Sequence, residues 1–155
     1  MVEKWRRAHS PDGAAGMPAH VTLLYPFAPS ADVDLEVLGS LFAGVEPFAY
    51  GLTGVAEWPQ DGVVYLDPHP AEPFVELTRR IVGRFPAYRP YGGQIELDEL
   101  HPHVTVVHTP DECVRADAVA SVTHSLPIEC SGDEVWLVHE VNGRWQRHTP
   151  FRLGR

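Results

Sequence analysis

The order of hydrophobic and polar positions along the chain predicts an α+β fold in which short strands alternate with helices. Six runs rich in β-branched and aromatic residues have the length and composition of strands, and they cover residues 20–25, 47–57, 62–67, 103–108, 127–139 and 144–153. Apolar residues three or four positions apart predict three helices, which cover Ser30 to about Gly44, residues 71–83 and a segment that begins with Thr109 as N-cap. The segment from Phe85 to Gly93, rich in Pro, Tyr and Gly, is expected to be a loop that crosses between two lobes.

The two halves of the chain repeat one succession of elements: a His-Val-Thr strand, a helix and a hairpin. Turn residues indicate the hairpins, at Pro59 to Gly62 in the first half and at Asn142-Gly143 in the second. The two His-Val-Thr segments begin at His20 and His103, which are 83 residues apart. We interpret this as an internal repeat. A pseudo-two-fold axis between the repeats would bring their first strands together across a shared groove.

Length and composition fit a single globular domain over residues 1–155, with 44% hydrophobic and 21% charged residues. We expect its lobes at roughly residues 1–85 and 86–155, with a possible exchange of strands between them. No apolar run approaches the ~18 residues of a membrane span, and the first residues lack the apolar region of a secretory signal. We therefore expect a cytoplasmic protein that has no membrane partner, with a monomer as the default oligomeric state.

The net charge of −9 argues against long duplex nucleic acid as a partner, because such binding requires many phosphates to be neutralised by Lys and Arg. Arginine nevertheless dominates the basic residues, and its side chain can bind phosphate through two hydrogen bonds. A small nucleotide or an RNA end is therefore the expected partner. The two cysteines, Cys113 and Cys130, are too few and too far apart for a disulfide scaffold, and we expect both to be reduced.

Alternation along a strand places His20 and Thr22 on one face, and it does the same for His103 and Thr105. The opposite face carries the apolar residues that anchor each strand, namely Val21, Leu23, Tyr25, Val104 and Val106. Two imidazoles that face each other across a phosphate can act as general base and general acid, because an unperturbed His titrates near pH ~6.5. The two hydroxyls can donate hydrogen bonds to the phosphate oxygens. This chemistry needs neither a metal nor another cofactor.

His101 and His103 lie on the same face of the expected strand, so the His-Pro-His segment could in principle chelate a metal. Pro102 stands between them, and no Cys or third His is present at ligand spacing. The expectation is therefore that no metal is bound, and a zinc hydrolase remains a less favoured alternative.

The segments PAHVTLLYPF (residues 18–27) and HPHVTVV (residues 101–107) resemble the two motifs of the two-histidine (2H) phosphoesterase superfamily, and most closely the bacterial 2′-5′ RNA ligase-like proteins. The resemblance covers nearly the whole chain. It implies a bilobal α+β fold, two antiparallel-sheet lobes with flanking helices around a central cleft lined by both motifs. It also implies that 2′,3′-cyclic or 2′-5′ phosphodiester bonds are hydrolysed or reversibly ligated, with His20 and His103 as acid and base and Thr22 and Thr105 as phosphate-binding residues.

Four further residues are candidates for contact with the substrate. Arg6 and Arg7 precede the first motif and could meet a phosphate, whereas Tyr25 and Phe27 follow it and could stack on a base. The tryptophans of the expected hairpins are assigned to packing. The alternative to an enzyme is a module that binds a nucleotide or a phosphate end without turnover.

Overall fold

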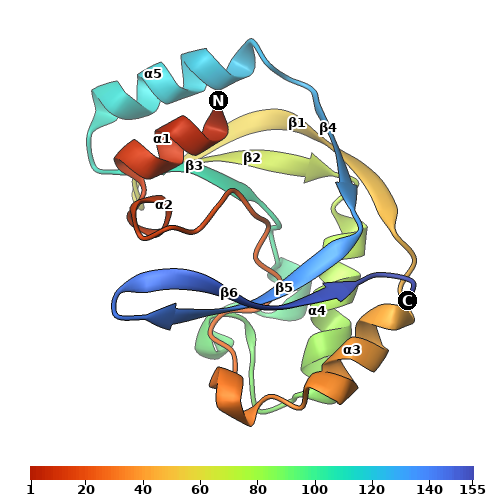
Figure 1. Cartoon of the computed structure of the whole chain (residues 1–155). Helices are drawn as coiled ribbons and strands as arrows, with labels where there is room; N and C mark the ends of the chain where they lie inside the picture. The colour runs from red at the N-terminus through yellow and green to blue at the C-terminus, as the bar shows by residue number, and fades with distance from the viewer.

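The computed structural model describes residues 1–155, and its larger layer is an antiparallel sheet with the strand order β3-β2-β1-β4. The strands are β1 (Phe48–Trp58), β2 (Val63–His69), β3 (Val104–His108) and β4 (Ile128–Gly132). Helices α1 (Val2–His9) and α5 (Glu112–Thr123) lie side by side over one face of this sheet (Figure 1). The short helix α2 (Pro11–Ala14) follows α1 directly.

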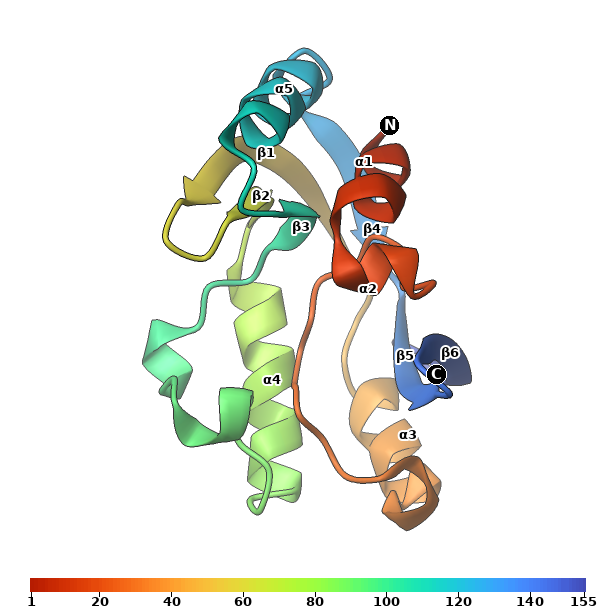
Figure 2. The ribbon, with the colours of Figure 1, turned by 90° about the vertical axis from the view of Figure 1, so that its left-hand side faces the viewer.

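The second layer is built on a two-stranded antiparallel hairpin of β5 (Glu134–Val141) and β6 (Arg144–Arg152). Helices α3 (Leu35–Ala43) and α4 (Glu72–Arg84) lie at this end of the molecule, and the chain between α2 and α3 runs down between them (Figure 2). Three short 3-10 helices complete the elements: η1 (Ser30–Asp32), η2 (Pro90–Gly93) and η3 (Leu97–Glu99). None of the helices combines the length and the apolar character that crossing a membrane demands.

Two separate hydrophobic clusters make the α+β molecule bilobal, as the sequence predicts. The first, here called the sheet core, joins the large sheet to α5 and consists of Leu52, Val64, Leu66, Val104, Val106, Val107, Ala118 and Val122. The second, here called the hairpin core, joins α3 and α4 to the β5–β6 hairpin and consists of Val33, Leu38, Phe42, Leu77, Ile81, Leu137, Phe151 and Leu153. Each lobe therefore has an apolar interior of its own.

The lobes are not the two halves of the chain, so the expected division near residue 85 is wrong. The large sheet pairs β2 with β3 and β1 with β4, and each of these pairs joins a strand from before residue 85 to a strand from after it. The hairpin core likewise mixes α3 and α4 with β5 and β6. Val64 of β2 and Val106 of β3, both with zero exposure, belong to the same sheet core, so this core is built from both halves of the chain. The exchange of strands between the halves is extensive.

Most of the predicted elements are present, with bounds shifted by a few residues. The strands at 47–57, 62–67 and 103–108 and the helix at 71–83 are confirmed. The Asn142-Gly143 hairpin is also confirmed, and both residues have the positive φ values, 52° and 75°, that this turn requires. The loop at 85–93 contains the short η2.

Three predictions about element boundaries are wrong. Residues 20–25 form no strand, because no neighbouring strand pairs with them. The expected strand 127–139 is divided at Asp133 into β4 and β5, which belong to different sheets. The helices begin later than expected, because Asp34 and Asp111 act as N-caps and accept hydrogen bonds from the backbone N–H groups of the first turn.

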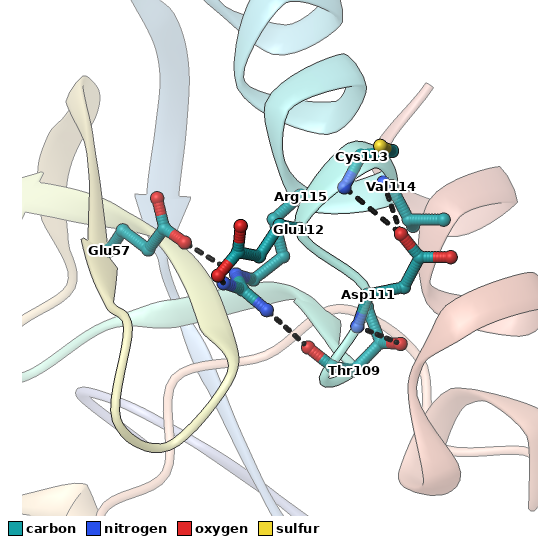
Figure 3. A network of polar contacts seen from close by, with 7 residues as sticks. All are labelled: Glu57, Thr109, Asp111, Glu112, Cys113, Val114 and Arg115. Carbon is teal, nitrogen blue, oxygen red and sulfur yellow. Dashed lines mark hydrogen bonds and ion pairs between the residues drawn. The ribbon is translucent and has the colours of Figure 1, made fainter.

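A buried arginine ties α5 to the sheet. Arg115 is 6% exposed, donates to the carboxylate of Glu57 on β1, and donates to the carbonyl oxygen of Thr109 at 3.0 Å (Figure 3). The N–H of Thr109 in turn donates to the carbonyl oxygen of Gly62 in the β1–β2 turn, at 2.8 Å. Gly62 has φ +67° and an added Cβ would lie 2.6 Å from the oxygen of Thr109, so only glycine fits. This network fixes the end of β3, the strand that carries the second motif.

Candidate functional site

The first motif lies between the two cores of the molecule. Val21 packs against the sheet core, whereas Leu23, two residues further on, packs against the hairpin core. His20 is half-buried and Thr22 is exposed. The ring nitrogen Nε2 of His20 lies 3.1 Å from Oγ1 of Thr22, so the two polar side chains share one side of the segment, as alternation predicts.

Side chains and one loop amide hold this segment in place of a strand partner. The N–H of Ala19 donates to the carboxylate of Glu3 on α1, and the hydroxyl of Thr78 on α4 donates to the carbonyl oxygen of Leu23 at 2.7 Å. The N–H of Tyr91 donates to the carbonyl oxygen of Tyr25, also at 2.7 Å. The N–H groups of residues 20–24 make no hydrogen bond within the protein. Hydrogen bonds from α1, from α4 and from the loop at Tyr91 therefore hold the backbone of the first motif, one at the N–H of Ala19 and two at carbonyl oxygens.

Arg6 is buried, and its guanidinium is engaged by the protein rather than exposed to a ligand. The side chain is 1% exposed, and its Nη1 donates to the carbonyl oxygen of Thr105 at 2.6 Å while its Nη2 donates to that of Met17 at 3.3 Å. Burial lowers the pKa of the Arg6 guanidinium, although the charges of Glu3 and Asp12 oppose this shift. Arg6 therefore connects the two motif segments. Its neighbour Arg7 is exposed on α1 and does not line the cavity described below.

Both motif histidines have the same hydrogen bond. Nδ1 of His20 lies 2.8 Å from the carbonyl oxygen of Pro18, and Nδ1 of His103 lies 2.8 Å from the carbonyl oxygen of His101. A carbonyl oxygen can only accept, so Nδ1 carries the proton in each ring. In the neutral imidazole the basic lone pair is then on Nε2 in both cases. The two histidines therefore have the same tautomer, although His20 lies in a segment without a strand partner and His103 directly precedes β3.

The environment lowers the pKa of both histidines. For His20, burial is the largest cause and the charge of Arg6 adds to it, while the bond to Pro18 and the charges of Asp12 and Glu3 act in the opposite direction. For His103, burial again dominates, and the charges of His101 and His20 lower the pKa further. That His20 shifts the pKa of His103 means that the two rings lie within reach of each other's charge. Thr105 is half-buried on β3, two residues from His103.

A cavity of about 830 Å³ opens along the first motif. His20, Thr22, Tyr25 and Phe27 all line it, whereas His103 and Thr105 lie outside its lining. Tyr25 is 54% exposed, so it is not the strand anchor that alternation predicts.

The two aromatic residues that follow the first motif differ in their contacts. The ring of Tyr25 lies 6.3 Å from that of Trp145 in an edge-on arrangement. Phe27 packs against the hairpin core and makes edge-to-face contacts with Phe85 and Tyr88. Tyr25 is thus free to meet a ligand, and Phe27 is a packing residue that borders the cavity.

Three residues around His103, namely Trp58, Tyr65 and Asp67, were not considered for a site from the sequence, and His101 was considered only as a metal ligand. The ring of Trp58 stacks on Tyr65 at 4.0 Å and meets His103 edge-on at 4.8 Å. Nε2 of His101 lies 2.7 Å from Oδ1 of Asp67. The sequence did hold a signal: Tyr65 and Asp67 alternate along β2, and Tyr65 is paired with Thr105 across the sheet. Only the strand register, which crosses from one half of the chain to the other, reveals this neighbourhood.

The His101–His103 pair does not converge on a metal-binding geometry. Their ring centroids are 6.5 Å apart, and Asp67 already engages Nε2 of His101. No group of three His, Cys, Asp or Glu side chains comes together anywhere in the chain as a metal site would require.

Comparison with solved structures places the fold. E. coli LigT in complex with 3′-AMP superposes with a TM-score of 0.60 at 20% identity, over 99% of this chain and 92% of that chain. E. coli LigT in complex with NADP⁺ gives a TM-score of 0.54 at 22% identity, over 99% and 91%. A crystal structure described as a phosphoesterase gives 0.54 at 19% identity, over 99% and 92%. At these identities the likeness establishes the shared bilobal α+β fold.

The family follows from the sequence comparison. A sequence model of the 2′-5′ RNA ligase superfamily matches residues 1–144. The chain therefore belongs to the 2′-5′ RNA ligase superfamily, a group of 2H phosphoesterases. Comparison with curated proteins gives no match.

Proposed function

We propose that this protein is a metal-independent phosphodiesterase that hydrolyses, or reversibly ligates, 2′,3′-cyclic or 2′-5′ phosphodiester bonds in nucleotides or RNA ends. The observation that carries the proposal is the matched pair of 2.8 Å hydrogen bonds from Nδ1 of His20 and of His103 to the backbone. These bonds place the basic lone pair on Nε2 of each ring. In the structure Nε2 of His20 accepts from the Thr22 hydroxyl at 3.1 Å, and a bound phosphate would take over that hydroxyl and release Nε2 for proton transfer. Membership of the superfamily supports the same class of activity.

The roles of the histidines follow from the demands of an in-line displacement at phosphorus. One imidazole takes a proton from the attacking oxygen, and the other gives a proton to the leaving oxygen on the opposite side. Each transfer is worth about 10²–10⁴-fold in rate, or about 3–5 kcal/mol of barrier. Which histidine acts as base depends on the direction of the reaction and on how the substrate lies.

Thr22 and Thr105 are proposed to bind the non-bridging oxygens of the phosphate. A hydroxyl donates one hydrogen bond, and its interaction strengthens as negative charge develops in the transition state. Thr22 is exposed beside His20, and Thr105 is half-buried two residues beyond His103. Each hydroxyl would then act on the same phosphate as the histidine of its own motif.

The cavity supports a nucleotide rather than a bare phosphate as substrate. A volume of about 830 Å³ suits a ligand of nucleotide size or larger. Tyr25 and Trp145 line it and offer aromatic faces for a base, while Arg147 adds a positive charge in an otherwise acidic protein. The solved complexes of E. coli LigT with 3′-AMP, ATP and NADP⁺ are consistent with small nucleotides as ligands of this fold.

The test is a substrate panel in EDTA. The protein is incubated with the four 2′,3′-cyclic nucleotides and with 2′-5′ and 3′-5′ dinucleotides, and mass spectrometry assigns the oxygen that retains the phosphate. The proposal predicts a product from the cyclic or the 2′-5′ substrates, and none when His20→Ala and His103→Ala are combined. Activity that persists in the double variant would disprove it.

Two other outcomes identify the alternatives. Tight binding without any product across the panel, measured by calorimetry, would indicate a module that binds nucleotide ends. Activity that disappears in EDTA and returns with Zn²⁺ would indicate a zinc hydrolase.

A further inference from the structure

The two motif histidines are held by the same hydrogen bond, but the residue that supplies the carbonyl differs. For His20 it is Pro18, whose ring fixes its own φ. For His103 it is His101, whose φ has no such restriction. Pro102 follows His101, restricts the backbone of that residue to extended conformations and fixes its own φ between the His101 carbonyl and His103. The side chain of His101 is a further point at which this carbonyl can be held.

The side chain of His101 is held by contacts with the large sheet. Its Nε2 donates to Oδ1 of Asp67 on β2 at 2.7 Å. The rings of Trp58 and Tyr65 are both nearly perpendicular to the His101 ring, with centroids at 5.5 and 5.3 Å. The imidazole is therefore held by a carboxylate and by two aromatic rings that belong to the large sheet.

The contact between Asp67 and His101 is not explained by stability. The side chain of His101 is 51% exposed and that of Asp67 is 39% exposed, and ion pairs this open to water contribute little to the free energy of unfolding. The contact matters because the backbone carbonyl of the same residue, His101, accepts a hydrogen bond from Nδ1 of His103 at 2.8 Å.

We propose that Asp67 and His101 form a positioning pair for His103: the carboxylate holds the His101 side chain, and the carbonyl of His101 fixes the tautomer and the direction of the His103 ring. Neither residue touches the phosphate. This inference rests on the proposed function for its kinetic consequence, but its structural part concerns the ring of His103 alone.

Charge and geometry make separable contributions at this site. The titratable groups that face His103 are His101 from its own segment, Asp67 and Tyr65 from β2, and His20 from the first motif. The charge of Asp67 raises the pKa of His103, against the larger lowering by burial and the charges of the two other histidines. A neutral acceptor at position 67 would therefore keep the ring direction but let the pKa of His103 fall further.

The experiment measures the His103 ring directly, by ¹⁵N NMR of protein labelled at histidine, with kinetics in parallel. In the unmodified protein the Nδ1–H tautomer should dominate at His103 and at His20. Asp67→Ala and His101→Ala should each give a mixture of tautomers at His103 and lower kcat about 10- to 100-fold, the size expected when a catalytic group loses its alignment. KM should change little, and His20 serves as the internal control.

Conservative variants separate alignment from charge. Asp67→Asn retains an oxygen that accepts from His101, so it should keep the tautomer and most of kcat while His103 titrates at a lower pH. His101→Gln retains an N–H donor for Asp67 and should restore most of what His101→Ala loses. The double variant of Asp67→Ala with His101→Ala should cost no more than either single change, because both remove one interaction.

The inference and the proposed function fail in different ways. If Asp67→Ala and His101→Ala leave both the His103 tautomer and kcat unchanged, the positioning pair does not exist, even though the enzyme is active. If the unmodified protein converts none of the panel substrates, the proposed function fails, and the NMR result still decides whether Asp67 and His101 direct the ring.

Discussion

Arg6 and Thr105 lie 99 residues apart in the chain and are joined by a 2.6 Å hydrogen bond from the guanidinium to the backbone carbonyl of the second motif. The same guanidinium reaches the carbonyl of Met17, three residues before His20. β3 is the edge strand of its sheet, so its carbonyls are not all satisfied by a neighbouring strand. One buried cation thus sets the spacing between the segments that carry the two histidines.

Replacing Arg6 by Met should lower both stability and turnover. Two buried carbonyls would lose their donor, at about 1–3 kcal/mol each, partly offset because a buried charge is removed as well. We expect a net loss of about 1–3 kcal/mol in the free energy of unfolding, measured by urea denaturation. The neighbouring exposed residue provides the control, since Arg7→Met should change neither quantity. Equal effects of the two substitutions would show that Arg6 does not connect the motifs.

Single substitutions of the motif histidines should each remove most of the activity. We expect His20→Ala and His103→Ala to lower kcat by about 10²–10⁴-fold, because each removes one proton transfer. The matched control is His108→Ala, which changes an exposed histidine at the end of β3, the strand that follows His103. Circular dichroism would verify that all three variants fold. A kcat within a factor of two of the unmodified protein for either motif variant would contradict its catalytic role.

The pH dependence of kcat/KM should be bell-shaped, with both limbs displaced to the acidic side of the ordinary histidine value of about 6.5. The reason is that burial lowers the pKa of His20 and of His103 in the free protein. One ring must be neutral and the other protonated, so activity should decline above the higher of the two lowered pKa values. A pH–rate profile in metal-free buffer measures this. A maximum above pH ~7 would show that burial does not govern these rings.

The same shifts make stability depend on pH in a direction that can be checked. The unfolded chain takes up protons on these histidines near pH ~6.5, and the folded chain does so only at lower pH. Stability should therefore be at its full value above that pH and decrease as the pH falls from there toward the lowered values. The combined His20→Ala and His103→Ala variant should show a weaker decrease in urea denaturation between pH 7 and pH 5. An identical decrease in both proteins would rule out this linkage.

Removing the threonine hydroxyls should weaken transition-state binding. Thr22→Val and Thr105→Val retain the shape of the side chain but lose a donor to a charged oxygen, worth about 1.5–3 kcal/mol. We expect kcat/KM to fall about 10- to 100-fold for each, whereas Thr22→Ser and Thr105→Ser should retain most activity. Loss of activity in the Ser variants as well would indicate that the methyl group, and thus packing, is what matters.

Base recognition should depend on the aromatic side of the cavity. Trp145→Ala removes the ring that meets Tyr25 and should raise KM for a 2′-5′ dinucleotide about 10-fold, because stacking is worth about 1–3 kcal/mol per base. The control is a substrate without any aromatic ring, methyl ribofuranoside 2′,3′-cyclic phosphate, for which Trp145→Ala and the unmodified protein should have similar KM. A parallel increase for both substrates would point to a general distortion of the cavity.

Local patterns in the sequence predicted most elements and the shared orientation of each motif, but not how the halves combine. The spacing of His20 and Thr22 was sufficient to place them on one side, even though their segment has no strand partner. The burial of Arg6 was not predicted, because the carbonyls that accept its hydrogen bonds belong to other segments of the chain. Asp67 was missed for the same reason, since its contact with His101 depends on the pairing of β2 with β3. Long-range pairing is what the local pattern does not contain.

The N–H groups of residues 20–24 make no hydrogen bond within the protein, so the backbone of the first motif is less restrained than that of β3, which follows His103. The amide hydrogens of β3 that pair with β2 should exchange slowly with solvent, whereas those of residues 20–24 should exchange within the dead time of the measurement. The proposed reaction needs His20 and His103 together, so every substrate has to order residues 20–24 and loses affinity by the entropy of doing so. Part of the binding free energy of any substrate is therefore used to order this one short segment.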